Sequence, residues 1–164
     1  MGAMSERRAF LNLGSNIEAE IYLPRAVELL RAAGRVNAIS TAWESLAVGT
    51  HGANFLNACV LFVTSLSADE LKEKILRPIE AKLGRTRGLD KFAPRKIDID
   101  IVLFDETVYK PDNWEHAFVV VPLAEIIPEF MHPTRGESLA QVAVHMREST
   151  WLAPRSEVLK FWME

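Results

Sequence analysis

The sequence predicts an α+β fold with a ferredoxin-like, split βαβ core, additional strands and a C-terminal helix. Segments with strand-like and helix-like spacing of apolar residues follow one another in the order β-α-β-β-α-β, which is the order of this core. The length of 164 residues suits one domain, and 49% hydrophobic with 25% charged residues is typical of soluble globular chains. We expect residues 1–8 to be a tag or disordered start and residues 9–164 to form a single domain.

The first half of the chain contains three strand-like segments and one amphipathic helix. Residues 10–14 form a short apolar run that ends at a glycine, and residues 36–48 and 57–64 are rich in residues that favour strands. Apolar residues recur at helical spacing over residues 17–33, and Gly34 predicts the end of that helix. These segments supply the first four elements of the predicted core.

A second helix is predicted between residues 67 and 83. Ser67 followed by Glu70 matches a capping box, in which each side chain satisfies a backbone N–H of the other residue. Pro78 predicts a kink or a break inside this helix, because proline lacks the N–H that a helix interior uses. Gly84 predicts its end.

Strands and helices are also predicted beyond this point. We expect strands at residues 96–104 and 118–121, a short helical turn at 123–127 and an amphipathic helix at 136–145. The tail, residues 151–164, is apolar enough to dock back on the domain or to meet a partner.

Composition excludes several classes of protein. A single cysteine, Cys59, rules out an internal disulfide framework and a metal site built from cysteines. The chain has no apolar run of about 18 residues and no signal peptide, so we expect a cytoplasmic protein with no membrane partner. A net charge of −3 gives no indication of a nucleic-acid partner. The glycine-rich loops of P-loop and Rossmann nucleotide sites are absent from the sequence.

Two carboxylates are predicted to lie on one face of the strand at residues 96–104. Because strand side chains alternate, Asp98 and Asp100 point one way while the odd-numbered apolar residues from Ile97 to Leu103 point the other. Like charges about 7 Å apart repel each other, and hard cations such as Mg²⁺ remove that repulsion. The alternative interpretation is a solvated strand face with two ordinary acids.

The segment before this strand is strongly basic. Between Lys82 and Lys96 there are six cations against one anion, Asp90. Arginine presents a planar fork that matches phosphate oxygens, and phosphoryl transfer needs cations that neutralise developing charge. The arginines alone are compatible with a solvated loop, whereas next to Asp98 and Asp100 they favour polyphosphate binding.

With these motifs, the chain resembles the 6-hydroxymethyl-7,8-dihydropterin pyrophosphokinase family of folate biosynthesis over residues 9–128. Four blocks occur in the family's order, and the Pro-Arg-x-x-Asp-x-Asp block is the most specific of them. The blocks are residues 13–16, 55–58, 79–87 and 94–101, and residues 118–123 with Pro128 match the family's closing strand.

The resemblance implies transfer of a pyrophosphoryl group from ATP, the co-substrate, to the hydroxymethyl oxygen of the pterin, with release of AMP. It implies that Asp98 and Asp100 bind two Mg²⁺ ions and act in catalysis together with Arg85 and Arg95. The implied nucleotide-binding residues are Glu80, Arg85, Arg87, Phe92 and Arg95, and the implied pterin-binding residues are Ser45, Leu46, Ala47, Phe55, Asn57 and Phe118.

Three of these residues also have a structural interpretation. Phe118 is compatible with a core position, Asn57 with a turn, and Glu80 with an ion pair to Lys74 or Lys82. We expect the pterin and ATP as small-molecule partners, with neither nucleic acid nor a membrane, and the protein is expected to be a monomer or a weak homodimer. Residues 46–54 and 84–95 are expected to close over the nucleotide and exclude water.

The chain departs from the family pattern at several positions. The segment 105–117 is short and lacks a Pro-His pair, and His116 stands where an arginine is usual. Phe92 replaces a tryptophan, and Leu46 and Ala47 replace two prolines. These departures leave two alternatives: a diverged paralogue that acts on another pterin-like alcohol, or a non-catalytic protein that binds a nucleotide or pterin.

Overall fold

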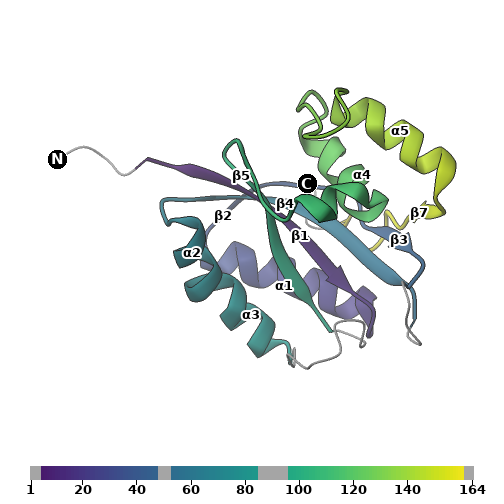
Figure 1. Ribbon diagram of the computed structural model, residues 1–164. Helices are drawn as coiled ribbons and strands as arrows, with labels where there is room; N and C mark the ends of the chain where they lie inside the picture. The colour runs from purple at the N-terminus through teal and green to yellow at the C-terminus, as the bar shows by residue number, and fades with distance from the viewer. Residues whose placement is uncertain (1–4, 48–52, 85–95, 161–164) are drawn as a thin grey trace.

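The computed structural model describes residues 5–47, 53–84 and 96–160, which form an antiparallel sheet with helices on both faces (Figure 1). The strands are β1 (Arg7–Ser15), β2 (Arg35–Ile39), β3 (Trp43–Ser45), β4 (Phe55–Thr64), β5 (Asp98–Phe104), β6 (Thr107–Val108) and β7 (Leu152–Pro154). Their hydrogen-bonded order is β6-β5-β1-β4-β3-β7, and β2 also pairs with β4. The strand β1 therefore has a partner along both edges, β4 on one side and β5 on the other.

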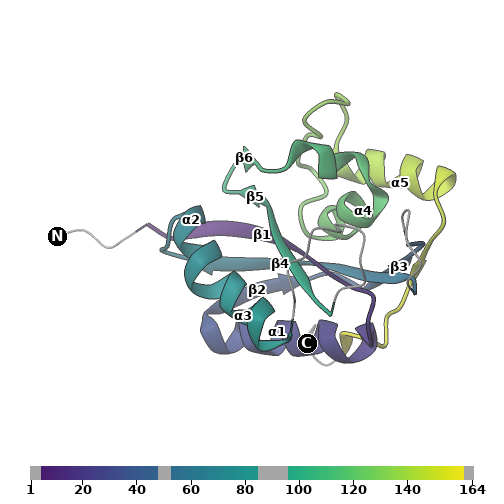
Figure 2. The ribbon, with the colours of Figure 1, turned by 60° about the horizontal axis from the view of Figure 1, so that its bottom comes forward.

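Two groups of helices cover opposite faces of this sheet. The helical segments are α1 (Ala19–Ala33), α2 (Ala68–Leu71), η1 (Lys72–Leu76), α3 (Arg77–Lys82), η2 (Pro111–Glu115), α4 (Ala117–Ile126) and α5 (Leu139–Ser149). Figures 1 and 2 show α1, α2 and α3 on one face and α4 and α5 on the other. The order β5-β1-β4-β2, with both crossover helices on one face, confirms the predicted ferredoxin-like core.

The helix predicted at residues 67–83 forms with a wide turn in its middle. Ser67 Oγ accepts a hydrogen bond from the Glu70 N–H at 3.1 Å, and the Glu70 carboxylate accepts one from the Ser67 N–H at 3.0 Å, which confirms the capping box. The segment η1 is π-helical and lies directly before Pro78 in α3. Since proline cannot donate to the helix, a turn with an extra residue accommodates the predicted break.

The strand predicted at residues 118–121 is wrong, because these residues lie in the ten-residue helix α4. Seven residues of α4 are buried, where the helix packs against the sheet and α5. A short, continuous apolar run is compatible with a buried strand or a buried helix, and its valines favoured the strand. The helical turn predicted at residues 123–127 is the second half of the same helix.

Alternation along β1 divides the interior into two cores. Leu11 and Leu13 pack on the side of α1, α2 and α3, whereas Phe10 packs on the side of α4 and α5. Asn12 and Gly14 continue the Phe10 side of the strand. The sheet face below α4 and α5 is therefore apolar at one end and polar at the other.

The predicted alternation along β5 holds for both aspartates but is wrong for Leu103. The register between β1 and β5 shifts at Phe10 and Leu11, which inserts a residue into β5. A β-bulge of this kind moves the following side chains to the other face. Leu103 consequently packs in the core below α4 and α5 instead of the core that contains Ile99 and Ile101.

Both ends of the described chain join the sheet. The strand β1 begins at Arg7, so residues 7 and 8 of the expected disordered start pair with Thr64 and Val63. At the other end, β7 pairs with β3, and Leu159 is fully buried against the core of α1. The expectation that the tail docks on the domain is therefore confirmed for its described part. Among the described residues, no helix has the length and apolar character that crossing a bilayer requires.

Candidate active site

Polar residues line up across three neighbouring strands on the sheet face of α4 and α5. The register places Gly14 of β1 between Asp98 of β5 and Asn57 of β4. Two residues back along β1, Asn12 lies beside Asp100. Neighbouring strands are about 4.8 Å apart, so the backbones of Asp98 and Asn57 are about 10 Å apart. Acidic groups on one side and an amide on the other thus flank a glycine.

Asp98 and Asp100 share one face of β5, as the sequence predicts, and both are partly exposed. The Asp100 side chain is 16% exposed and accepts a hydrogen bond from Lys110 Nζ at 2.9 Å. Within the described part of the chain, no three carboxylate, imidazole or thiol groups form a cluster that would hold a metal unaided. Two carboxylates on one face fit Mg²⁺ that completes its coordination with phosphate oxygens, which is the ligand set it prefers.

Two buried amide oxygens on this face have no hydrogen-bond partner among the described residues. They are the Oδ1 atoms of Asn12 and Asn57, whose residues are only 8% and 4% exposed. Leaving a buried acceptor unpaired costs about 1–3 kcal/mol. Two such atoms beside a pair of carboxylates therefore favour a polar ligand on this face.

Glu80 connects α3 to the strand that carries both aspartates. Its residue is 2% exposed, and one carboxylate oxygen accepts a hydrogen bond from the Ile99 N–H at 2.8 Å. The other oxygen accepts one from Arg77 Nη1 at 2.7 Å. These contacts support the position of β5, while a direct contact of Glu80 with a nucleotide stays a prediction.

A small cleft with about 60 Å³ of space opens at the outer edge of β5. Leu76, Ile99 and Ile101 give it an apolar lining, and Tyr109 closes one side. In the described chain β6 pairs with β5 only at Leu103 and Phe104, so backbone polar groups beside the cleft have no strand partner. The mixed apolar and charged lining is typical of small-molecule sites, whereas the space is smaller than the roughly 300–1,000 Å³ of a fully formed one.

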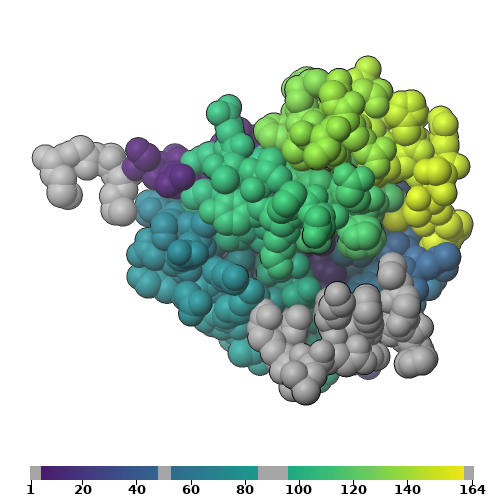
Figure 3. Space-filling model, in the orientation of Figure 1, coloured from purple at the N-terminus to yellow at the C-terminus, as the bar shows by residue number. Residues whose placement is uncertain are grey.

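Charged residues surround this cleft. They come from the helical segments α2, η1 and α3, from β5 and from the segment after β6: Asp69, Lys72, Arg77, Asp100 and Lys110. Figure 3 shows the helical segment α2–α3 in teal meeting the green segment that follows β5 on the face turned to the viewer. Three cations against two anions make the cleft suitable for an anionic ligand.

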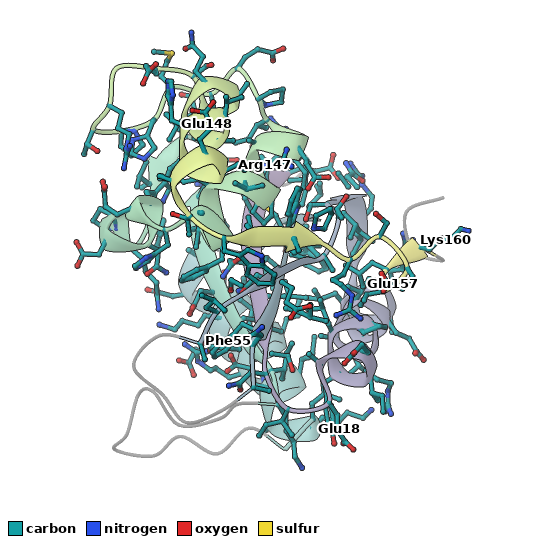
Figure 4. The ribbon with its side chains drawn as sticks, turned by 90° about the vertical axis from the view of Figure 1, so that its right-hand side faces the viewer. Glu18, Phe55, Arg147, Glu148, Glu157 and Lys160 are labelled. Carbon is teal, nitrogen blue, oxygen red and sulfur yellow. The ribbon has the colours of Figure 1, made fainter. Side chains whose placement is uncertain are left out.

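The residues predicted for the other substrate lie where β3 pairs with β4. Ser45, which is 5% exposed, is opposite the half-buried Phe55. Leu46 is exposed and Ala47 is half-buried. Figure 4 shows Phe55 well apart from Arg147 on α5. The pairing brings these side chains to the end of the sheet that also holds Asn57.

Phe118 lies at the start of α4 rather than in a strand. Its ring is stacked on the ring of His116, with centroids 4.8 Å apart and an angle of 10° between the planes. Phe118 is half-buried, so it is not a fully enclosed core residue. Its contact with a planar substrate stays a prediction.

Glu44, which precedes Ser45 in β3, contacts the C-terminal tail. Its carboxylate accepts hydrogen bonds from Asn54 Nδ2 and Arg155 Nη1, both at 2.9 Å. The Asn54 amide first, and then the Arg155 guanidinium, hold the pKa of Glu44 below its ordinary value. The same arginine contacts Glu20 on α1, so one cation joins α1, β3 and the tail.

We predict that Glu44→Gln lowers the free energy of unfolding near pH 7 by up to about 1 kcal/mol, because it removes a partly exposed ion pair. A carboxylate whose pKa is lowered by folding stabilises the fold above its unfolded pKa, and this contribution is lost as the pH falls through the folded pKa. The difference between wild type and variant should therefore begin to shrink as the pH falls below 4.5, the ordinary value, and disappear below the lowered pKa of Glu44 in the fold. Urea unfolding over this pH range measures the difference.

The exposed Glu129, in the turn after α4, offers a matched control, and Glu129→Gln should follow the wild-type curve at every pH. A difference between wild type and Glu44→Gln that is as large near pH 3 as near pH 7 would contradict the ionic explanation.

Four predicted site residues lie outside the described residues: Arg85, Arg87, Phe92 and Arg95. Most of the two segments predicted to close over the nucleotide, residues 48–52 and 85–95, lies there as well.

Sequence analysis missed two residues of this site. The sequence does indicate that Asn12 is a candidate site residue, since it is a polar residue inside the apolar run at residues 10–14. Nothing in the sequence indicates that Lys110 belongs to the site, because only the turn after β5 brings it back to Asp100.

Comparison with known proteins gives one family. A family model described as 7,8-dihydro-6-hydroxymethylpterin-pyrophosphokinase (HPPK) matches residues 10–128. Relatives named 2-amino-4-hydroxy-6-hydroxymethyldihydropteridine pyrophosphokinase are similar over most of the chain. The one from Synechocystis sp. is 35% identical over 82% of this chain and 73% of its own length. Those from Aquifex aeolicus and Methylorubrum extorquens are 38% and 41% identical, over 80% and 82% of this chain and 88% and 93% of theirs.

Solved structures with a similar fold belong to longer chains. An HPPK-DHPS in complex with substrates has a TM-score of 0.65 at 14% identity, and the match covers 88% of this chain and 44% of that one. The Plasmodium falciparum HPPK-DHPS with SDX-DHP has a TM-score of 0.63 at 12% identity, over 88% and 46% of the two chains. This chain spans less than half the length of those structures, and at such identities the likeness concerns the fold.

Proposed function

Because this chain belongs to the 7,8-dihydro-6-hydroxymethylpterin-pyrophosphokinase family, we propose that it transfers pyrophosphate from ATP to 6-hydroxymethyl-7,8-dihydropterin. The observation that carries this proposal is the row of Asp98, Gly14 and Asn57 across three strands. The proposed metal-binding residue and the proposed ring-binding residue lie about two strand spacings apart in this row, with a residue between them that has no side chain. The two substrates of this reaction need such a division.

The reaction joins the hydroxymethyl oxygen to the β-phosphorus of ATP. The bond from that phosphorus to the oxygen bridging it to the α-phosphorus breaks, AMP leaves with the bridging oxygen, and the hydroxyl proton passes to solvent. Two Mg²⁺ ions held by Asp98 and Asp100 would neutralise negative charge on the phosphate oxygens. The role of the two carboxylates is to fix the position of the phosphates relative to the pterin.

We assign the nucleotide to the cleft at the edge of β5. A planar base is proposed to lie against Leu76 and Ile101, at the edge where β5 has no strand partner among the described residues, and the triphosphate then extends towards Asp100. Arg85, Arg87, Phe92 and Arg95 are proposed as nucleotide and phosphate contacts because of the resemblance in residues 79–101. Arg85 and Arg95 are proposed to stabilise charge on the transferred group.

We assign the pterin to the side of β4 and α4. Asn57 presents an unpartnered, buried oxygen that would accept a hydrogen bond from the pterin edge. Phe55 and Phe118 are proposed to stack on the two faces of the ring, and the residues from Ser45 to Ala47 to bind its remaining polar atoms.

The test is the identity of the nucleotide product. Incubation with ATP, Mg²⁺ and 6-hydroxymethyl-7,8-dihydropterin should give AMP in a one-to-one ratio with the pyrophosphorylated pterin. Release of ADP would indicate an ordinary kinase, and no AMP at high enzyme concentration would refute the proposal. Omission of the pterin controls for hydrolysis of ATP.

A changed substrate preference is the second candidate. The observation that favours it is the His116 ring, which is stacked on the Phe118 ring that we assign to the pterin. A pterin can stack on this face of the Phe118 ring only if the His116 ring moves away. A different ring system would be bound with the two side chains arranged differently. Activity on a panel of hydroxymethyl heterocycles decides between them, and activity confined to the dihydropterin would rule out the second candidate.

We predict that Gly14→Ala raises the KM for the pterin roughly tenfold and changes the KM for ATP little, because about one hydrogen bond is lost. A Cβ at this position would lie 2.7 Å from Asn57 Nδ2, so the amide must move. Steady-state kinetics with each substrate varied in turn measures the effect.

A double-mutant cycle provides the control. In an Asn57→Ala background the added methyl group meets no amide, so Gly14→Ala should then have little further effect on the KM for the pterin. Fully additive effects would show that the glycine acts elsewhere.

A further inference from the structure

Among the residues that the structure describes, Lys110 is the one that forms an ion pair with the carboxylate of Asp100. Its Nζ is 2.9 Å from Asp100 Oδ1, within hydrogen-bond distance. The Lys110 side chain is 47% exposed and that of Asp100 is 16% exposed, so the ammonium is solvated while the carboxylate is largely enclosed. A cation therefore contacts a carboxylate that the proposed function gives to Mg²⁺.

The backbone at Lys110 is held in an unusual conformation. Its φ is 49°, in the left-handed region that residues other than glycine rarely adopt. The turn is fixed on both sides, since the Tyr109 N–H donates to the Val102 carbonyl and the Lys110 carbonyl accepts from the Asn113 N–H. Strained conformations that the surrounding structure maintains are found preferentially at functional sites.

Lys110 also lines the cleft assigned to the nucleotide. Two other cations do so, but Arg77 is engaged by the buried carboxylate of Glu80 at 2.7 Å. Lys72 lies on the helical side of the cleft, whereas Lys110 lies on the side of Asp100. A lysine is a mobile point charge and a common ligand of phosphate. If Asp100 binds a metal ion, the phosphates of a nucleotide in this cleft are anions that this ammonium can bind instead.

We propose that Lys110 is a phosphate-binding residue of this pyrophosphokinase. In the ligand-free enzyme its ammonium group pairs with Asp100. When Mg²⁺ binds the Asp100 carboxylate, the ammonium group moves to the polyphosphate of the nucleotide. This inference rests on the proposed function, because it needs a metal at Asp100 and a nucleotide in the cleft. It identifies a cation in the short segment between β5 and α4, where the sequence departs from the family pattern.

The exchange predicts effects of opposite sign for Lys110→Met. Without nucleotide, Mn²⁺ as a probe should bind the variant roughly threefold more tightly than wild type, because the competing ammonium is gone. In contrast, Mg²⁺ with α,β-methylene-ATP, an analogue that resists cleavage, should bind roughly tenfold more weakly, because a charged hydrogen bond is lost. Electron paramagnetic resonance measures the first quantity and titration calorimetry the second.

Three further measurements separate this role from a structural one. Adenosine, which has no phosphate, should bind wild type and Lys110→Met equally. Lys110→Arg should restore affinity for the nucleotide analogue, since it keeps the charge. Lys74→Met, a control at an exposed lysine that does not line the cleft, should change both affinities less than twofold.

Several results would overturn the inference. One is an affinity of Lys110→Met for the nucleotide analogue within twofold of wild type, and another is an equal loss of affinity for adenosine. Because these readouts are binding and not turnover, they are independent of the product test. A wild type that binds the analogue but forms no AMP refutes the proposed function alone, and a wild type that binds no nucleotide refutes both.

Discussion

Asp98→Asn and Asp100→Asn should each lower the rate of AMP formation by at least about a thousandfold, which corresponds to about 4 kcal/mol of transition-state stabilisation. The amide keeps the size of the side chain and removes the charge that a metal ion needs. Both residues lie on one face of β5, partly exposed, opposite Asn12 and Gly14 of β1. The effect should appear in kcat as well as in the KM for ATP, since the phosphates are then bound in the wrong position.

The same variants should remain folded. The ion pair that Asp100→Asn removes is partly solvated, and such pairs contribute about 0–1 kcal/mol to stability. Asp112→Asn is the matched control, because Asp112 is an exposed acidic residue of η2 in the same segment as Lys110. It should keep wild-type turnover. If Asp98→Asn retained a tenth of the wild-type rate at saturating Mg²⁺, the reaction would not require a metal ion bound by Asp98.

Trp114→Ala should lower the free energy of unfolding by about 3–5 kcal/mol, the largest stability effect that we expect. The residue is fully buried, and its indole N–H donates to the carbonyl oxygens of Val102 and Tyr109, both at 3.2 Å. Its ring packs against Phe130, with 5.8 Å between centroids. Truncation therefore leaves a cavity between η2 and the sheet and also removes a donor for two carbonyl groups.

Trp114→Phe separates these two contributions, because it keeps most of the ring volume and removes the N–H. It should cost about 1–2 kcal/mol, the value of lost hydrogen bonds to buried acceptors together with a small volume change. Urea unfolding measures both variants. A loss below about 1 kcal/mol for Trp114→Ala would mean that the segment from Tyr109 to Trp114 is not held by this side chain. Since that segment carries Lys110, nucleotide affinity at low temperature should fall in Trp114→Ala as well.

Local patterns predicted most of the secondary structure correctly. The capping box at Ser67 and Glu70 depends on residues three positions apart, and it forms as the sequence predicts. The alternation that puts Asp98 and Asp100 on one face is equally local, because it follows from the pleat of a strand. The family resemblance then adds the substrates and the nature of the reaction.

The failures of sequence analysis have a common physical cause. Residues 118–121 form a helix because α4 is enclosed by the sheet and α5, and packing on all sides removes the periodicity that distinguishes a helix from a strand. Leu103 changes face because β1 and β5 slip by one residue at Phe10. Neither the enclosure nor the slip is encoded within a few neighbouring residues.

The sequence by itself determined the ferredoxin-like order of elements, the paired aspartates and the family, since each depends on residue types at short, fixed spacings. Only the tertiary structure decided that Gly14 separates Asp98 from Asn57, that Glu80 supports the edge of β5, and that Lys110 contacts Asp100. These contacts join residues on different strands and turns. Their geometry is set by strand register and by the packing of two cores, which no local stretch of the chain specifies.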